Sequence, residues 1–207
     1  MTKQNYHHGD LRNALIQAGA EILFSEGVGA LSLRSVARKA GVSHSAPYAH
    51  FADKKSLIAA ISTYGFHLLS DELQFVIDEY SSNPPMMLVK FALTYCDFAL
   101  KNPAYFKLMF SGIMENEKGE YPAFVETSQQ GFELLLQVVN ICQQAGVLAA
   151  EDAEIQAVNL WSLVHGHTAL LLERQFSHHL LNRVSSGRII WQGLQQFTKI
   201  EQLPFPD

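Results

Sequence analysis

The sequence has 207 residues, 48% of them hydrophobic, and a net charge of −5. A chain of this length can bury one large core, or a small domain beside a larger one. No apolar run approaches the roughly 20 residues that span a bilayer, and the first residues lack the apolar core of a signal peptide. These features exclude an integral membrane protein, and we expect no membrane partner and a cytoplasmic location.

The first strong local signal is a short helix predicted over residues 33–40, after a longer one over 10–26. Ser32 can cap its first turn because a serine hydroxyl accepts from free helical amides. Gly41 stands where a left-handed residue ends a helix, and Val42 can plug the space between two crossing helices. One buried face is expected, formed by Leu33, Val36, Ala37 and Ala40.

A second short helix is predicted over residues 43–51, with Ser43 as its cap. Isolated helices of under roughly 12 residues are marginal in water, so it must be anchored from behind, and Tyr48 and Phe51 can serve. Pro47 lies one residue too deep for a helix that starts at Ser43, so the helix starts at His44 or Ser45 or begins as a tight turn. Its polar outer face fits the major groove of DNA: Ser43, His44, Ser45 and His50.

Asp53 is expected to cap the next helix, over residues 53–80. Lys54 and Lys55 stand in its first turn, where each cation opposes the helix dipole at a cost of about 0.3–1 kcal/mol. Two readings stay open for them: contacts to DNA phosphates, or two solvated lysines. Residues 1–56 carry seven basic and four acidic residues, a net charge of +3, whereas residues 57–207 carry eight and 16, a net charge of −8. This asymmetry would orient the molecule on DNA.

The rest of the chain is predicted to be helical over residues 86–101, 122–145, 151–174 and 186–200, with a short helix after Pro103 and a loop over 115–121. We therefore expect an all-α fold with two domains. Residues 1–56 form a three-helix, helix-turn-helix DNA-binding domain, and residues 57–207 form a larger helical bundle. Cys96 and Cys142 are expected to be buried free thiols, with a redox-sensing pair as the alternative.

Aromatic side chains gather in the second domain, where the interior of a helical bundle can hold a small ligand. The alternative is that these rings simply fill the core. Few charges share their faces, so a ligand would be mostly apolar. The candidate ligand-binding residues are Phe91, Tyr95, Phe98, Phe106, Phe110, Trp161 and His165.

A stripe of small residues predicts a helix-to-helix interface between two copies of the chain. Its members are Val158, Ser162, Gly166 and Ala169, and Ile190, Leu194 and Phe197 of the last helix are expected to join them. His165 and His167 point in different directions on a helix, so we expect no metal site. His165 itself is expected to be a buried or interface residue, with ligand contact as the alternative.

Ala40 to Ser43, followed by Tyr48-x-His-Phe-x-Asp-Lys54, resembles the amino-terminal signature of the TetR family of transcriptional regulators. The resemblance implies that Tyr48 and Lys54 contact backbone phosphates, and it places Arg34, Ser35, Ser43, His44 and His50 on or beside the DNA surface. Pro47 departs from the pattern, because the family usually carries a branched apolar residue there. Trp161-x-x-x-His165-Gly166 resembles a motif of one subgroup of TetR carboxy-terminal domains.

This resemblance implies a homodimer that binds a palindromic double-stranded DNA operator and represses transcription until an apolar small-molecule effector releases it. The alternative is a ligand-free or partner-controlled architectural DNA-binding protein. No glycine-rich phosphate loop, nucleophile elbow or paired-carboxylate motif is present, so we expect no enzyme and no cofactor. Catalysis with His165 as general base is the third reading, and turnover of a bound compound would support it.

Overall fold

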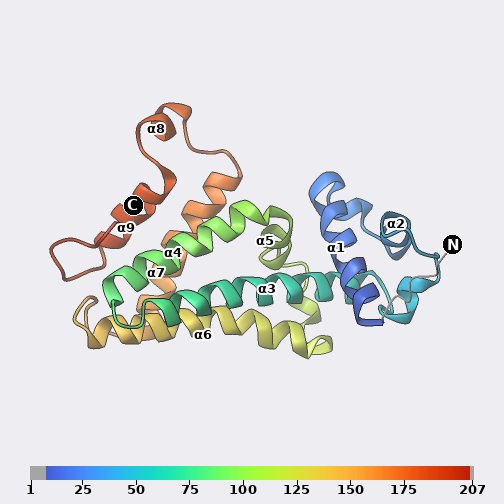
Figure 1. The fold of residues 1–207 in the computed structure, drawn as a ribbon, viewed down its shortest axis with the longest axis horizontal. Helices are drawn as coiled ribbons and strands as arrows, with labels where there is room; N and C mark the ends of the chain where they lie inside the picture. Colours follow the sequence, from blue (N-terminus) through green and yellow to red (C-terminus); the bar gives the residue numbers. More distant parts are fainter. Residues whose placement is uncertain (1–7, 206–207) are drawn as a thin grey trace. The chain divides into compact units, whose positions relative to one another are not determined.

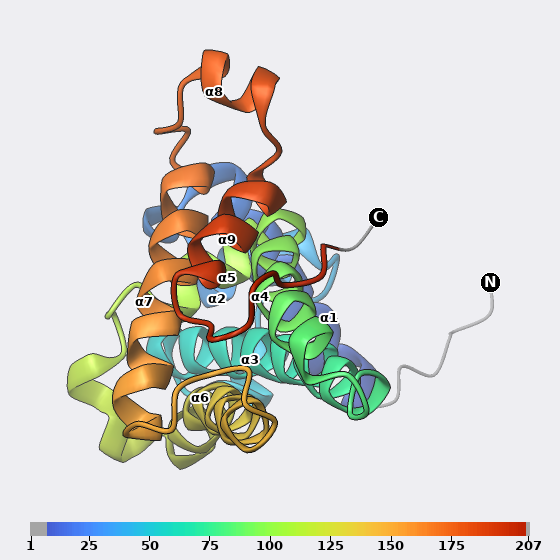
Figure 2. The ribbon, with the colours of Figure 1, turned by 90° about the vertical axis from the view of Figure 1, so that its left-hand side faces the viewer.

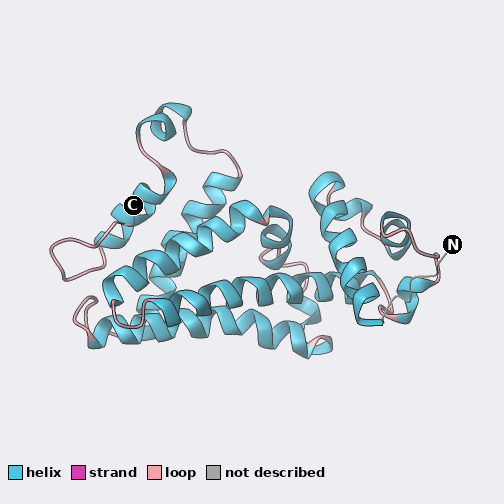
Figure 3. Cartoon of the chain, viewed as in Figure 1, coloured by secondary structure: helices cyan, strands magenta, loops and turns pink. Residues whose placement is uncertain are grey.

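A computed structural model describes residues 8–205 of the chain (Figure 1). Within that range the chain forms helices joined by loops and turns (Figure 3), which confirms the all-α class. No described helix has the length and apolar character needed to cross a membrane. The elements are α1 His8–Glu26, η1 Val28–Ala30, α2 Leu33–Lys39, η2 Ala46–Ala49, α3 Lys54–Glu79, α4 Pro84–Lys101, α5 Pro103–Met109, η3 Glu115–Glu120, α6 Pro122–Gln144, α7 Ala153–Leu172, α8 His178–Arg183 and α9 Ser186–Gln195.

Short polar residues begin the helices of the carboxy-terminal half. The Asp152 side chain accepts from the Ile155 amide at the start of α7, and the Ser185 hydroxyl accepts from the Arg188 amide at the start of α9. Such caps satisfy amides that have no partner inside a helix. Gly146 follows α6 at φ 71°, a left-handed conformation that glycine adopts at little cost.

Three elements differ from the sequence-based expectation. Residues 115–120 form the 3-10 helix η3 rather than a loop, and α8 was not predicted. The last helix ends at Gln195 instead of near residue 200. Beyond it, Thr198 forms a bridge with Leu148, and the Lys199 amide donates to the Val147 carbonyl at 2.9 Å. These main-chain partners replace those that a longer helix would supply.

The chain packs into two compact units. Unit 1 comprises the residues up to His67 together with 103–128, and unit 2 comprises residues 68–102 and the residues from 129 onward. Helices α3 and α6 are each shared between the two units. In unit 1 the Phe66 ring packs edge-on against Phe110 and Phe124. Gly65 allows α5 to approach α3, since a Cβ there would lie 2.7 Å from Met109 Sδ.

Helices α4, α7 and α9 lie side by side in unit 2 (Figure 2). Phe98 of α4, Leu160 of α7 and Leu194 of α9 are buried among them. Gly193 makes the approach of α9 to α7 close, because a Cβ at this position would lie 3.0 Å from Leu163. The core that these three helices form in unit 2 is therefore mainly apolar.

Candidate DNA-binding site and aromatic cluster

Two end motifs define helix α2. The Ser35 amide donates to Ser32 Oγ (3.0 Å), and the Ser32 amide donates to Ser35 Oγ (2.9 Å), a reciprocal capping box. At the other end Gly41 has φ 69°, and the Val42 amide donates to the Ala37 carbonyl at 3.0 Å. This is the pattern of a Schellman motif. The predicted cap at Ser32 and the stop at Gly41 are confirmed.

The segment after Gly41 is not the α-helix predicted over 43–51. Ala46–Ala49 form a single 3-10 turn with Pro47 at its second position. Proline has no amide hydrogen and is tolerated only in a first turn, so helical structure begins just before it. The Ser43 hydroxyl pairs with Ser45 Oγ at 3.2 Å instead of capping a helix. The predicted α-helix with a Ser43 cap is wrong. Of the alternative, a helix that begins as a tight turn, only the turn is present.

The residues around this turn present a polar surface to solvent. Ser43, His44 and Ser45 are exposed, and Tyr48 is 55% exposed. His50 is half-buried, with its ring 6.3 Å from the Phe51 ring. The structure therefore brings together the four polar residues predicted on this face, with Tyr48 beside them, in a turn in place of a helix.

Pro47 and Phe51 are the buried anchors of the turn. Arg12 of α1 places its guanidinium 5.6 Å from the centroid of the Phe51 ring, at cation–π distance. Phe51 was predicted as an anchor, and this is confirmed. Tyr48 was predicted as the second anchor, which is wrong, because Pro47 occupies the inward position and leaves the tyrosine ring outside.

Helix α3 begins beside this surface with a second reciprocal cap. The Ser56 amide donates to Asp53 Oδ1 (2.8 Å), and the Asp53 amide donates to Ser56 Oγ (3.1 Å), which confirms Asp53 as the cap. The two following lysines differ. Lys54 is half-buried and its Nζ donates to the Val28 carbonyl at 2.8 Å, whereas Lys55 is exposed.

The two candidates on α2 also differ. Arg34 is exposed, but Ser35 is half-buried and its hydroxyl takes part in the capping box and donates to the Ala30 carbonyl at 2.9 Å. Ser35 thus has a local structural task in addition to its predicted place near DNA. On the same helix Lys39 pairs with Glu21 at 2.8 Å, and this hydrogen bond raises the pKa of Lys39.

Three of the predicted ligand-binding residues form a hydrogen-bonded cluster in unit 2. Tyr95 Oη lies 2.7 Å from His165 Nδ1, and Trp161 Nε1 donates to Tyr95 Oη at 3.3 Å. Burial raises the pKa of Tyr95 and lowers the pKa of His165, so both groups are neutral near pH 7. A neutral His165 that carries its proton on Nε2 accepts a hydrogen bond at Nδ1 from the Tyr95 hydroxyl, whose oxygen in turn accepts one from Trp161.

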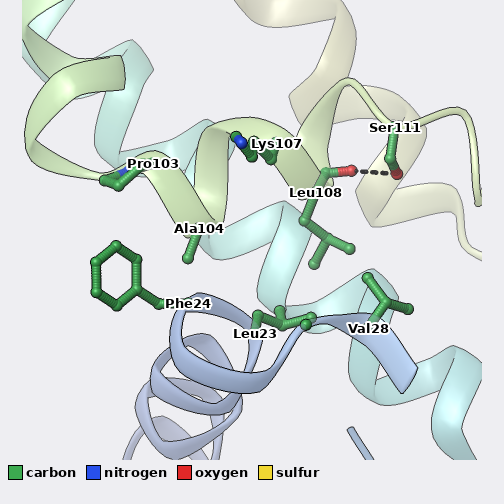
Figure 4. Close-up of a pocket in the computed structure, with 9 residues that line it drawn as sticks. Leu23, Phe24, Val28, Pro103, Ala104, Lys107, Leu108 and Ser111 are labelled. Atoms are coloured by element: carbon green, nitrogen blue, oxygen red, sulfur yellow. Dashed lines mark hydrogen bonds between the residues drawn. The ribbon is translucent and has the colours of Figure 1, made fainter. Parts of the chain in front are cut away.

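The other predicted ligand-binding residues lie in different places. Phe91 and Phe98 are buried in unit 2, whereas Phe106 and Phe110 belong to unit 1, with ring centroids 4.9 Å apart. A cavity of about 470 Å³ does occur in unit 1, between α1 and α5 (Figure 4), and none of the seven predicted residues lines it. Sequence reasoning missed this cavity. No sequence signal marks it, because the exposure of Phe24 and the packing of α5 against α1 appear only in the folded chain.

The predicted interface stripe lies on the surface of α7. Val158 is 46% exposed, Ser162 is exposed, Ala169 is half-buried, and a Cβ at Gly166 would meet no atom within 4 Å. Exposed Ile155 and Leu170 extend this apolar surface.

The expected contribution of α9 to an exposed interface is wrong in part. Ile190 and Leu194 are 2% and 1% exposed, because α9 packs its apolar face against α4 and α7 of the same chain. Phe197 lies beyond the end of α9 and is half-buried.

Histidine and cysteine side chains outside these sites have structural surroundings. The His167 ring packs 4.9 Å from the Phe176 ring, away from the partners of His165, and its buried Nε2 has no hydrogen-bond partner among the described residues. Cys96 and Cys142 are buried free thiols, as predicted, and burial raises the pKa of Cys142 to about 12. The described residues include no group of three or more histidine, cysteine or acidic side chains placed to hold a metal ion.

Two family models match the chain. "Bacterial regulatory proteins, tetR family" matches residues 15–61, which include α2, η2 and the start of α3, and "Tetracyclin repressor-like, C-terminal domain" matches residues 88–186. The chain belongs to the TetR family. It is a transcriptional regulator of the helix-turn-helix type. The narrower likeness of Trp161, His165 and Gly166 to one subgroup of TetR carboxy-terminal domains stays a prediction.

Relatives and solved structures match this TetR-family chain over most of its length. It is 24% identical to the HTH-type transcriptional regulator YobS of Bacillus subtilis, over 81% of this chain and 82% of YobS. A structure of a protein of unknown function from a Rhodococcus species is 30% identical with a TM-score of 0.80, covering 94% of this chain and 97% of that one. The TetR-family regulator PfmR of Thermus thermophilus shares the fold at 17% identity, with a TM-score of 0.67 over 88% and 94% of the two chains.

Proposed function

We propose that this TetR-family protein is a non-catalytic homodimeric repressor that binds a palindromic DNA operator and releases it when an apolar small molecule binds. Residues 1–56 carry DNA reading, and residues 57–207 carry dimerisation and effector binding. The observation that carries this proposal is the exposed polar turn at residues 43–50, which buried Pro47 and Phe51 hold in place. Polar side chains on a rigid support are what reading of base edges requires.

The solvent exposure of each proposed DNA-binding side chain indicates which part of the DNA it can contact. Tyr48 and Lys55 are exposed and can reach phosphates from the surface, and Arg34, Ser43, His44 and Ser45 lie where base edges or phosphates can be contacted. The Lys54 ammonium group donates one hydrogen bond to the Val28 carbonyl, and its two other N–H groups can donate to a phosphate. His50 and Ser35 border the contact surface.

Dimerisation is assigned to the exposed α7 stripe of Val158, Ser162, Gly166 and Ala169, extended by Ile155 and Leu170. Apolar residues exposed along one helix face, with a glycine at the centre, suit close packing against the same helix of a second copy. A palindromic operator follows from two-fold symmetry, because each copy then meets one half-site.

Effector binding is assigned to unit 2, beside the cluster of Tyr95, Trp161 and His165. The cluster joins the buried Tyr95 hydroxyl to Trp161 and His165 nearer the surface, so polar groups lie among aromatic rings. This arrangement is typical of sites that orient an apolar ligand. Helix α3 runs from the DNA-binding residues into unit 2, so a ligand that favours one position of α3 changes the placement of the DNA-binding turns.

A thermal-shift screen of the full-length protein against apolar compounds, followed by measurement of DNA affinity with each stabilising compound, tests the effector function. We expect a stabilising compound to release the DNA. Tyr95→Phe removes the central hydroxyl while keeping the ring, and it should weaken the response to the compound without weakening DNA binding. A complete screen without a stabilising compound would favour the ligand-free architectural alternative.

A further inference from the structure

The hydroxyls of Ser43 and Ser45 form a pair on the exposed surface of the DNA-binding turn. Both residues are exposed, and a hydrogen bond of 3.2 Å joins their Oγ atoms. The proposed function places both serines where DNA can be contacted, without saying which base they read. The hydrogen bond within this serine pair limits the bases that it can match.

Main-chain hydrogen bonds hold the two serines in this arrangement. The Ala46 amide donates to the Ser43 carbonyl at 3.1 Å, and the Tyr48 amide donates to the Ser45 carbonyl at 3.2 Å. Each bond spans three residues, as in a 3-10 helix, whereas the bonds of an α-helix span four. Buried Pro47 has no amide hydrogen and cannot donate to the Ser43 carbonyl, so the segment keeps its tight turn.

The tight turn is what allows the serine pair to form. In an α-helix, side chains two residues apart do not face each other. The helix predicted over residues 43–51 would therefore have separated the two hydroxyls. Pro47 thus positions the serine pair through the main chain.

The hydrogen bond within the pair determines what its hydroxyls can offer to a partner. A serine hydroxyl has one proton to donate and two lone pairs that accept. Whichever hydroxyl donates, the accepting one keeps its own proton, and the donating oxygen keeps its lone pairs. The serine pair therefore presents one donor and one acceptor side by side.

Adenine is the base whose major-groove edge matches this pattern. Its N7 accepts a hydrogen bond and its N6 amino group donates one. Guanine presents two acceptors and would need two donors, whereas cytosine presents an amino donor and thymine presents the O4 acceptor beside a methyl group. Asparagine and glutamine bind adenine in the same way, through one donor and one acceptor.

We propose that the serine pair reads an adenine in each half-site of the operator, with one hydroxyl donating to adenine N7 and the other accepting from the N6 amino group. This inference rests on the proposed function, because it requires the turn to enter the major groove. Pro47 is a positioning residue for this contact, since it keeps the turn that brings Ser43 and Ser45 together.

The base assignment is tested by selecting duplexes from a random library with the full-length protein and its variants. We expect the wild type to enrich adenine at one position of each half-site. Ser43→Ala and Ser45→Ala should each reduce this preference about tenfold at that same base pair, because either change leaves a single hydroxyl. Both side chains are exposed, so the fold should survive. Ser81→Ala removes an exposed hydroxyl outside the turn and should leave the preference unchanged.

Base analogues at the enriched position test the two hydrogen bonds separately. 7-Deazaadenine lacks the N7 acceptor and unsubstituted purine lacks the N6 amino group, so each should weaken wild-type binding about fivefold. Neither should weaken binding by a protein that carries both Ser43→Ala and Ser45→Ala. Uracil in place of the paired thymine removes only the methyl group and should leave the affinity unchanged.

The positioning role is tested with Pro47→Ala, which restores the amide hydrogen and introduces the strongest helix former. We expect Cα chemical shifts of residues 43–51 in the DNA-free protein to become helical, and the adenine preference to fall about tenfold while affinity for random DNA is kept. Pro122→Ala, at the exposed first residue of α6, should change neither. Unchanged shifts, or an unchanged adenine preference despite helical shifts, would exclude this role of Pro47.

The outcomes separate this inference from the proposed function. Enrichment that neither serine variant alters, effects of the two variants at different base pairs, or a base other than adenine at the affected position would overturn the adenine contact while DNA reading by the turn stands. Absence of any enrichment by the wild type, at a salt concentration where the duplexes are bound, would instead contradict the proposed function.

Discussion

The DNA-binding turn and the Tyr95 cluster are both built from polar and aromatic side chains, but they satisfy these groups in opposite ways. In the turn, His44, Ser45 and Tyr48 face solvent. In the cluster, the buried Tyr95 meets the polar atoms of the half-buried His165 and of Trp161, whose side chain is 37% exposed. The polar side chains of the turn are therefore open to hydrogen bonds from an external partner. Those of the cluster already bond to one another, so a ligand must break one of these bonds to reach them.

The largest change in operator affinity should come from the α7 stripe, which is exposed as the DNA-binding turn is. Gly166→Leu places a side chain where the protomer leaves open space, so the fold is expected to survive. If two copies meet there, the variant should be monomeric in sedimentation. Its operator affinity should fall by about 10²–10⁴, the typical gain from linking two binding sites.

Gly131→Leu is the matched control, because a Cβ at Gly131 of α6 also meets nothing within 4 Å. That variant should remain dimeric. A Gly166→Leu protein that stays dimeric at low micromolar concentration would place the interface elsewhere.

The next effect concerns base reading by the turn. His44 is exposed at its outer edge, so His44→Ala should relax the preference for particular operator positions by about 1–3 kcal/mol per position. Competition between the operator and singly substituted duplexes measures this preference. An equal loss of affinity on operator and random DNA would instead assign His44 to the DNA backbone.

A smaller effect is expected for the phosphate contact of Lys54. Lys54→Ala should weaken binding to all sequences alike and reduce the slope of log K against log salt by about 1. Lys101→Ala removes an exposed lysine of α4 and should leave the slope unchanged. An unchanged slope for Lys54→Ala would mean that this lysine contacts no phosphate and only forms the hydrogen bond to the Val28 carbonyl.

The smallest effect concerns the pH dependence of stability that His165 of the cluster contributes. Burial lowers the pKa of His165 and His167 in the folded protein, so the unfolded chain takes up protons first as the pH falls. The free energy of unfolding should therefore be flat above the unfolded pKa of about 6.5 and decrease below it. His165→Gln should reduce this decrease and leave the part due to His167. A decrease of the same size in denaturant titrations of the variant would exclude His165 as a source.

The sequence predicted those features that local signals determine. Ser32, Gly41 and Asp53 mark helix ends by their own chemistry, and all three act as expected. The sequence showed that Pro47 departs from the family pattern. It did not show whether the helix would be shortened or reduced to a single turn, because that depends on which side chain packs inward. Burial of Ile190 and Leu194 could not be foreseen, because a helix with one apolar face can bury it within its own chain or against a second copy. The cavity beside Phe24 depends on α1 and α5, which are distant in sequence.

The proposal that the turn at residues 43–50 reads DNA as part of a dimer is tested most directly by selecting duplexes from a random library with the full-length protein. We predict enrichment of a two-fold symmetric sequence whose half-sites lie about 34–36 Å apart, one duplex turn. His44→Ala should alter the enriched bases in both half-sites. Recovery of unenriched DNA by the wild-type protein, at a salt concentration where the duplexes are bound, would contradict sequence-specific reading by this turn.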